Sequence, residues 1–430
     1  MATPPKVLPE VFRVLAAPDL SRPLRILVFS TLYPSSVRPG HGVFVETRLR
    51  ELLASGQVQA RVVAPVPWFP SSHPRFGARA LMAATPKAET RHDIEVLHPR
   101  YLLPPRIGQN VAPFALALGA WATLRKLQRE GFDFDLIDAH FYYPDGVAAA
   151  MLARWFNKPL VITARGSDLN AYGRDAWPRA LMRRAAARAN ASVGVCQALV
   201  DVLRGWGVDP ARLHVIGNGV DTQRFMPLPP AQARARLGLQ GQPLLISVGH
   251  LVPVKGHDLS LQALARLAPR WPGLRMCFVG EGPQRAALQA QAAALGIAEQ
   301  VRFVGAVSNQ DLATWYSAAD AMLLSSRSEG WANVLLEAMA CGTPVVATDV
   351  GGTSEVLASS VAGRLVAPHD PVAIADGLNA LLADLPDRDA VRTYAEGFGW
   401  QRTSNAQLQL FRDVLARAPG GRGPNRVSAP

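Results

Sequence analysis

The sequence has 430 residues, which is long enough for two or three domains with sizeable cores. Apolar residues make up 49% of the chain and charged residues 18%, and this balance excludes an intrinsically disordered protein. The formal net charge is +12, which makes an acidic partner or surface a candidate for binding.

The basic excess lies in the first half of the chain. Residues 1–228 contain 28 Lys and Arg against 17 Asp and Glu, whereas residues 229–430 contain 17 against 16. No helix-turn-helix, zinc module or aromatic-studded basic sheet accompanies this charge, so we expect no nucleic-acid partner. Anionic lipid headgroups or a diphosphate-bearing acceptor fit the basic half better, and a basic protein without such a partner is the alternative.

Residues 1–23 contain five prolines and are expected to form a loosely held leader. Residues 25–30 form the first predicted buried strand, and the loop after it carries Gly40 and Gly42 before a helix at residues 43–54. A glycine-rich turn between a strand and a helix can bind phosphate through backbone N–H groups. The turn matches neither Gly-x-Gly-x-x-Gly nor a Walker loop, which disfavours a nicotinamide-dependent dehydrogenase.

Strands alternate with helices through the rest of the first half. His140 follows one of these strands, and a histidine at the carboxyl end of a strand is a better ligand candidate than one in mid-strand. A helix after Trp177 carries four arginines, which form either a membrane-facing stripe or a solvated face: Arg179, Arg183, Arg184 and Arg188. The predicted strands cover residues 58–64, 94–98, 135–139, 160–163, 192–196 and 213–217, and the predicted helices start after Val111 and near Pro144.

A proline-rich hinge at residues 227–230 separates this series of strands and helices from a second one. Its predicted strands are 244–248, 274–279, 301–305, 321–325, 345–348 and 363–366, and its helices are 333–341, 371–383, 388–396 and 400–416. Two such series predict an α/β protein with two Rossmann-like doubly wound domains that face each other across a cleft. We place them at residues 24–228 and 229–399, followed by a helix at 400–418 and a flexible tail at 419–430.

Cysteine usage and hydropathy indicate a cytoplasmic protein. Cys196, Cys277 and Cys341 are far apart and lack metal-ligand spacing, so we expect buried thiols in a reducing compartment and no metal site. The longest mostly apolar stretch, residues 111–124, is too short to cross a bilayer.

Two glutamates stand out between residues 325 and 355. Glu329 follows a predicted strand, and Glu337 lies about one turn into a helix with Asn333 as its N-cap and Gly342 as its C′ residue. Isolated glutamates of this kind are usually solvated surface charges. Here small residues surround both positions and let the backbone approach a ligand closely, so a phosphate or sugar site is predicted.

This stretch also resembles a known family. The Glu-x7-Glu pair stands within Ser-Glu-Gly-Trp-x-Asn-Val-x-x-Glu-Ala-Met-Ala-Cys-Gly-Thr-Pro-Val-Val-Ala-x-x-Val-Gly-Gly, which resembles the signature of glycosyltransferase family 4. The resemblance extends over roughly residues 25–415. It implies the GT-B fold, a last helix that crosses back to the first domain, retaining chemistry without a metal, and a UDP- or GDP-sugar as co-substrate.

The resemblance also assigns expected roles. Lys255 matches the cation that clamps the donor diphosphate, while His250 stands where the family usually has Arg, and Arg165 stands where it often has His. Glu329 is expected on the donor sugar and Glu337 on the ribose, so the predicted catalytic residues are Glu329, His140 and Lys255. The predicted donor-binding residues are Gly40, Gly42, His250, Lys255, Val304, Val307, Glu329, Gly330, Trp331, Ala332, Asn333, Val334 and Glu337.

The predicted function is retaining transfer of a hexose-type sugar from a nucleotide-diphosphate sugar to a lipid-linked or glycan acceptor in cell-surface or exopolysaccharide biosynthesis. Such an enzyme is expected in the cytoplasm, or peripherally on the inner face of the membrane. Two alternatives stay open. One is an epimerase or phosphorylase-like enzyme of the same fold, and the other is a catalytically silent partner subunit.

Overall fold

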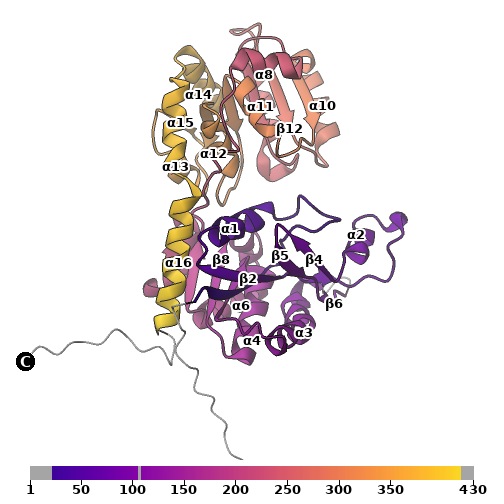
Figure 1. Cartoon of the computed structure of the whole chain (residues 1–430). Helices are drawn as coiled ribbons and strands as arrows, with labels where there is room; N and C mark the ends of the chain where they lie inside the picture. The colour runs from indigo at the N-terminus through magenta and orange to yellow at the C-terminus, as the bar shows by residue number, and fades with distance from the viewer. Residues whose placement is uncertain (1–21, 105–107, 418–430) are drawn as a thin grey trace, which may run out of the picture.

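The computed structural model describes residues 22–104 and 108–417. Two α/β domains lie one above the other, each built on its own sheet, and a long helix runs down one side of the lower, first domain (Figure 1). The predicted leader and tail lie outside the described residues, apart from Arg22 and Pro23 at the end of the leader. The predicted fold class of two Rossmann-like doubly wound domains is confirmed.

The first sheet has eight strands in the order β10-β9-β8-β7-β1-β2-β5-β4. All neighbouring pairs are parallel except β4 with β5, which are antiparallel at one edge. The central strands are buried apolar runs because helices cover both faces of a parallel sheet. The strands are β1 (Leu24–Phe29), β2 (Val58–Val63), β4 (Ala88–Arg91), β5 (Ile94–Leu97), β7 (Leu136–His140), β8 (Leu160–Ala164), β9 (Ala191–Gly194) and β10 (Leu213–Val215).

The second sheet has six parallel strands in the order β13-β12-β11-β14-β15-β16. From β11 the next strands are added toward one edge of the sheet as far as β13, and from β14 onward they are added toward the other edge. Open α/β sheets bind ligands at such a switch point, beyond the carboxyl ends of the strands. The strands are β11 (Leu244–Val248), β12 (Arg275–Val279), β13 (Val301–Gly305), β14 (Ala321–Leu324), β15 (Val345–Thr348) and β16 (Gly363–Val366).

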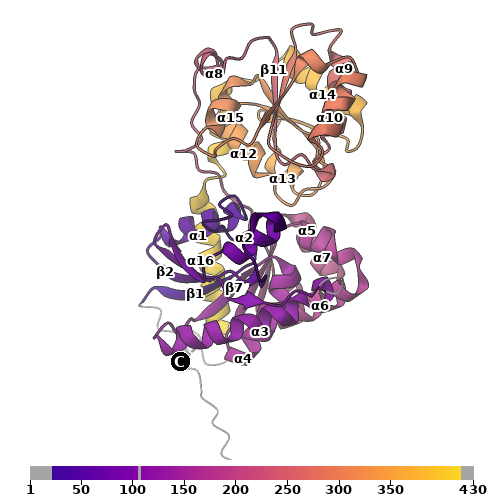
Figure 2. The ribbon, with the colours of Figure 1, turned by 90° about the vertical axis from the view of Figure 1, so that its right-hand side faces the viewer.

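The helices pack on both faces of each sheet (Figure 2). In the first domain they are α1 (Val43–Leu53), α2 (Ala78–Ala84), α3 (Gly108–Arg129), α4 (Val147–Phe156), α5 (Ser167–Asn170), α6 (Ala176–Arg188) and α7 (Gln197–Gly205). Next along the chain come α8 (Pro230–Leu237), α9 (His257–Leu267), α10 (Arg285–Ala294), α11 (Leu312–Ala318), α12 (Asn333–Ala340), α13 (Thr353–Val356), α14 (Pro371–Ala383), α15 (Arg388–Glu396) and α16 (Trp400–Arg417). A small pair of strands, β3 (Val66–Pro67) and β6 (Arg100–Tyr101), joins the loops that lead to α2 and α3.

Helix α16 crosses back to the first domain, as the resemblance implied. Its inner residues Leu408, Leu410 and Phe411 are buried in the same core as strands β1 and β2, and it packs along α1. Figure 1 shows it as the yellow helix that starts near the junction of the domains and runs along the first domain. The last helix in the sequence therefore completes the core of the first domain.

One local prediction was inexact and another was wrong. The helix expected near Pro144 starts as a π-helix at Tyr142–Gly146, and α4 itself begins at Val147. The Tyr142 N–H donates to the Asp168 carboxylate. Asn333 is the first residue of α12 and not its N-cap, which is Ala332. The Asn333 side-chain oxygen instead accepts a hydrogen bond from Asn218 of the first domain, so a tertiary contact replaces the cap.

Other local predictions are confirmed. Gly342 follows α12 with φ of 74°, the left-handed conformation of a C′ residue. All three cysteines are free and buried. The domain limits of 24–228 and 229–399 stay a proposal, supported by the position of the predicted hinge between β10 and α8.

We predict that Phe411→Ala lowers the free energy of unfolding by about 3–5 kcal/mol, because it removes a fully buried ring from the core that α16 completes. Urea denaturation followed by circular dichroism measures this change. Gln409→Ala is the matched control on the exposed face of the same helix and should change stability by less than about 0.5 kcal/mol. Equal stability of the two variants would show that α16 does not hold the first domain.

Candidate active site

The carboxyl ends of the two sheets meet at a backbone contact between two turns. Arg165 and Gly166 follow β8, and Glu329 and Gly330 follow β14. A Cβ on Gly330 would overlap the carbonyl oxygen of Arg165, and a Cβ on Gly166 would lie 3.0 Å from the Gly330 Cα. Only glycine lets these turns approach so closely, and the contact brings the loop of Glu329 onto the first domain.

Lys255 and Glu329 form an ion pair in the second domain. Lys255 Nζ lies 2.6 Å from Glu329 Oε1, and Ser326 Oγ donates to the same oxygen at 2.6 Å. Glu329 is 9% exposed, so its carboxylate is held by these donors rather than by bulk water. The structure thus brings together two of the predicted catalytic residues, 74 positions apart in sequence.

Glu337 lies one turn into α12 and is half-buried. Its Oε2 accepts a hydrogen bond of 2.8 Å from the Tyr316 hydroxyl. Burial raises the pKa of Glu337, although the bond from Tyr316 and the charge of Arg224 oppose this shift. Glu337 is therefore not the solvated helix charge that an isolated glutamate would be.

His140 is buried and bonded through both ring nitrogens. Arg165 Nη2 lies 2.8 Å from Nδ1, and Asp138 Oδ2 lies 3.2 Å from Nε2. A guanidinium only donates and a carboxylate only accepts, so Nδ1 is the acceptor and the proton resides on Nε2. Burial lowers the pKa of His140, which agrees with a neutral ring.

Two arginines surround this histidine without a carboxylate partner of their own. Arg165 Nη1 donates to Asn218 Oδ1 at 2.9 Å, and the buried Arg48 donates to the same oxygen at 3.2 Å. Within the described part of the chain, neither guanidinium forms an ion pair, and Arg165 Nε and Arg48 Nη2 lack a hydrogen-bond partner. Burial and the neighbouring Arg48 lower the pKa of Arg165 to about 9.

Asp138 supplies negative charge behind these cations. Burial alone would raise its pKa, but His140, Arg48 and Arg165 keep it below the ordinary value. Its Oδ2 also accepts from Gln407 of α16, whose own side-chain oxygen accepts from Arg48 Nε at 2.7 Å. The network therefore connects α16, the two arginines and His140 to Asn218, which in turn donates to Asn333 at the start of α12.

The remaining predicted donor residues lie around this contact or farther away. Gly42 precedes α1 with φ of 76°, and Gly40 stands in the open turn before it. His250 is exposed, and its Nδ1 lies 3.4 Å from the Glu281 carbonyl oxygen. Val304 and Val307 stand at the end of β13, half-buried beside the core of the second domain. Trp331, Ala332 and Val334 continue the loop into α12, and Trp331 packs against the cores of both domains.

Sequence reasoning missed several residues that hold the site. Asp138 precedes His140 by two positions on one strand, so both side chains share a face, and that spacing could have revealed the pair. Arg48, Gln407 and Tyr316 carried no comparable signal, because their partners lie far away in the sequence.

Within residues 22–104 and 108–417, no three His, Cys, Asp or Glu side chains are grouped so that they could hold a metal ion. In that same part of the chain, every helix is too short or too polar to cross a membrane.

Two family models match this chain. The model described as Glycosyltransferase Family 4 covers residues 40–224, and Glycosyl transferases group 1 covers residues 231–398. A D-inositol 3-phosphate glycosyltransferase 1 from Catenulispora acidiphila is 32% identical over 438 residues, which is 94% of this chain and 98% of the relative. The chain belongs to glycosyltransferase family 4. A D-inositol 3-phosphate glycosyltransferase from Frankia alni is 37% identical over 66% of this chain and 75% of its own length.

Solved structures show the same fold. Sucrose-phosphate synthase from Thermosynechococcus elongatus superposes with a TM-score of 0.72 at 22% identity, covering 92% of this chain and 100% of that one. The Anabaena protein HepE in complex with UDP gives 0.70 at 22% identity, covering 91% and 100%. This family member is therefore a glycosyltransferase with the GT-B architecture.

We predict that Gly330→Ala lowers the initial rate of sugar transfer at least about tenfold, because the added methyl group pushes the loop of Glu329 away from the Arg165 turn. Gly205→Ala is the control, since a Cβ there meets nothing within 4 Å. Rates are measured at saturating donor, and melting temperatures confirm that both variants fold. A Gly330→Ala enzyme with the parent rate would rule out a functional role for this contact.

Proposed function

We propose that this enzyme transfers a hexose-type sugar, with retention of configuration, from a nucleotide-diphosphate sugar to a lipid-linked or glycan acceptor. The ion pair of Lys255 with Glu329 carries the proposal. It sets a cation for a diphosphate beside a carboxylate for a sugar, at the point where the two domains touch. Cell-surface or exopolysaccharide biosynthesis needs this reaction class.

The proposed step breaks the bond between the anomeric carbon and the diphosphate oxygen. An acceptor hydroxyl oxygen forms its bond to that carbon on the same face, and its proton passes to the leaving diphosphate. Lys255 stabilises the charge on the leaving group, and Glu329 stabilises positive charge on the sugar ring. In the structure Lys255 is paired with Glu329, so an arriving diphosphate shares this cation.

The donor is proposed to be a UDP- or GDP-sugar. Structural neighbours solved with UDP and with UDP-glucose support a nucleotide of this size, since HepE with UDP-glucose superposes with a TM-score of 0.69. Glu337 is proposed to bind the ribose hydroxyls through Oε1, because Tyr316 already occupies Oε2. Main-chain groups near Val304 and Val307 are proposed to contact the base, and backbone amides at Gly40 and Gly42 to lie near the phosphates.

His140 is proposed to act through Arg165 rather than on the substrate. Both of its ring nitrogens are already bonded, so it is better placed to orient the guanidinium than to exchange a proton. This proposal changes the role expected from the sequence, where His140 stood among the catalytic residues.

A phosphorylated polyol is a second candidate acceptor. The relatives named above are D-inositol 3-phosphate glycosyltransferases, and such an acceptor carries a phosphate. Arg165 favours this candidate, because among the described residues its guanidinium contacts only neutral acceptors. Transfer assays that compare inositol phosphate with lipid-linked sugars distinguish the two acceptors.

We also propose that the protein works in the cytoplasm, next to the inner face of the membrane. Three free buried thiols support a reducing compartment.

A phosphorylase-like activity is distinguished by its requirement for inorganic phosphate, which the proposed transfer lacks.

We predict that Glu337→Ala weakens binding of the nucleotide donor roughly tenfold to hundredfold, because each hydrogen bond to a charged carboxylate contributes about 1.5–3 kcal/mol. Glu329→Ala should instead lower turnover more than affinity. Isothermal titration with UDP- and GDP-sugars and initial rates separate the two effects. Glu299→Ala, on an exposed turn of the same domain, is the control and should leave both unchanged. Parent-like affinity and turnover in both site variants would refute the assignment.

We predict that His250→Arg tightens binding of the donor diphosphate several-fold, because it adds a fixed charge in the loop that carries Lys255, where the family usually has Arg. His369→Arg makes the same chemical change in an exposed turn before α14 and should leave the dissociation constant unchanged. Weaker binding by His250→Arg would show that the position needs an imidazole for another purpose.

A further inference from the structure

Helix α3 presents an apolar face to solvent. Phe114, Leu118 and Trp121 follow one another at spacings of four and three, so they lie on one side of the helix. All three are exposed, Leu118 by 68%. Large apolar side chains that gather on one exposed face mark a binding surface, whereas single ones do not.

A second group of exposed apolar side chains lies in the loops next to the start of α3. Trp68, Leu102 and Leu103 are exposed, the first two by 53% and 65%, and they line one pocket of about 710 Å³ together with Gly108 and Gln109 at the start of α3. Leu103 lies against Gly108, which links the loop to the helix. In Figure 1 both α2 and α3 lie on the side of the domain away from α16.

Basic side chains border these apolar residues, and acidic ones are almost absent. Residues 52–88 and 96–129 contain no Asp or Glu. Five of the exposed cations in these ranges lie near α2 or at the end of α3: Arg75 and Arg79 near α2, and Arg125, Lys126 and Arg129 at the end of α3. The nearest acid along α3 is Glu130, which lies 3.6 Å from Lys126. These segments combine exposed apolar side chains with an excess of positive charge.

We propose that this surface, made of Trp68, Leu102, Leu103, Phe114, Leu118 and Trp121 with the five cations, docks on an anionic lipid bilayer. Below it is called the α3 surface. Tryptophan and leucine enter the headgroup region, and arginine and lysine attract anionic headgroups. A second copy of this chain is the poorer partner, because a two-fold contact would place like charges against each other.

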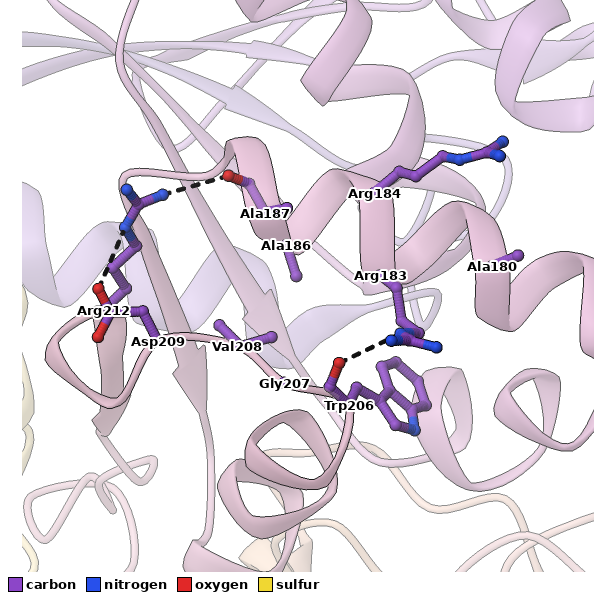
Figure 3. A pocket seen from close by; sticks show the side chains of 10 residues that line it. All are labelled: Ala180, Arg183, Arg184, Ala186, Ala187, Trp206, Gly207, Val208, Asp209 and Arg212. Atoms are coloured by element: carbon purple, nitrogen blue, oxygen red, sulfur yellow. Dashed lines mark hydrogen bonds and ion pairs between the residues drawn. The ribbon is translucent and has the colours of Figure 1, made fainter.

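The arginines of α6, which the sequence also offered as a membrane stripe, are arranged differently. Arg183 turns toward Trp206 and donates to its carbonyl oxygen at 3.1 Å, while Arg184 points away from it (Figure 3). Arg183 is thus anchored and Arg184 is directed elsewhere, and this pair provides a matched charge control in the same domain.

The test is flotation of the full chain with vesicles of phosphatidylglycerol and phosphatidylcholine. The Debye length is about 10 Å at 0.1 M salt and about 3 Å at 1 M, so we expect flotation at the lower salt, loss at the higher, and none with phosphatidylcholine alone. Leu118→Glu with Trp121→Glu should lower the bound fraction about tenfold. Arg125→Ser with Lys126→Ser and Arg129→Ser should lower it severalfold and reduce its dependence on salt.

Two controls match these changes. Arg183→Ser with Arg184→Ser removes charge from α6, and Val372→Glu with Leu385→Glu places acids on exposed apolar positions of the second domain. Both should float like the parent. A parent that stays in solution overturns the proposal, as do controls that lose as much binding as the α3 variants. Sedimentation that shows a dimer, dispersed by Leu118→Glu with Trp121→Glu, would assign the surface to a second copy instead. Transfer to a soluble acceptor is measured in parallel, so a failed docking surface is not confused with a failed proposed function.

Discussion

The backbone contact between the Arg165–Gly166 turn and the Glu329–Gly330 turn is the constraint on which the site depends. A side chain at Gly330 would overlap the Arg165 carbonyl, so the two domains can meet at this distance only through glycine. Other bonds between the domains lie around it, including Asn218 to Asn333 and the Gln197 N–H to Glu355. If the two turns moved apart, these hydrogen bonds between the domains would lengthen together.

Charge is distributed unequally across that contact. In the second domain Lys255 and Glu329 neutralise each other, and Ser326 donates a further hydrogen bond to the Glu329 carboxylate. In the first domain Arg48 and Arg165 share neutral acceptors, and Asp138 compensates them from behind. Buried cations without a direct partner are costly, so they are expected where a substrate anion supplies the missing charge.

The sequence predicted the regular elements well, because apolar runs and glycine or proline stops are local. The predicted strands at residues 244–248, 301–305 and 345–348 match β11, β13 and β15 in their bounds. Antiparallel β4 and the β3–β6 pair were missed, since their short or polar segments show no apolar run. The network behind His140 was also beyond reach, because Arg48 and Gln407 are 359 positions apart and only the fold brings them together.

That long separation shows what the crossing helix contributes to the site. Gln407 of α16 accepts from Arg48 and donates to Asp138, so a residue that follows the second domain in sequence completes the polar cluster of the first. Thr403 of the same helix donates to the Gly217 carbonyl, next to Asn218. Because Asn218 binds Asn333, a displacement of α16 is transmitted to the start of α12 and the loop of Glu329. The crossing helix therefore couples the orientation of the Glu329 loop to the packing of the core of the first domain.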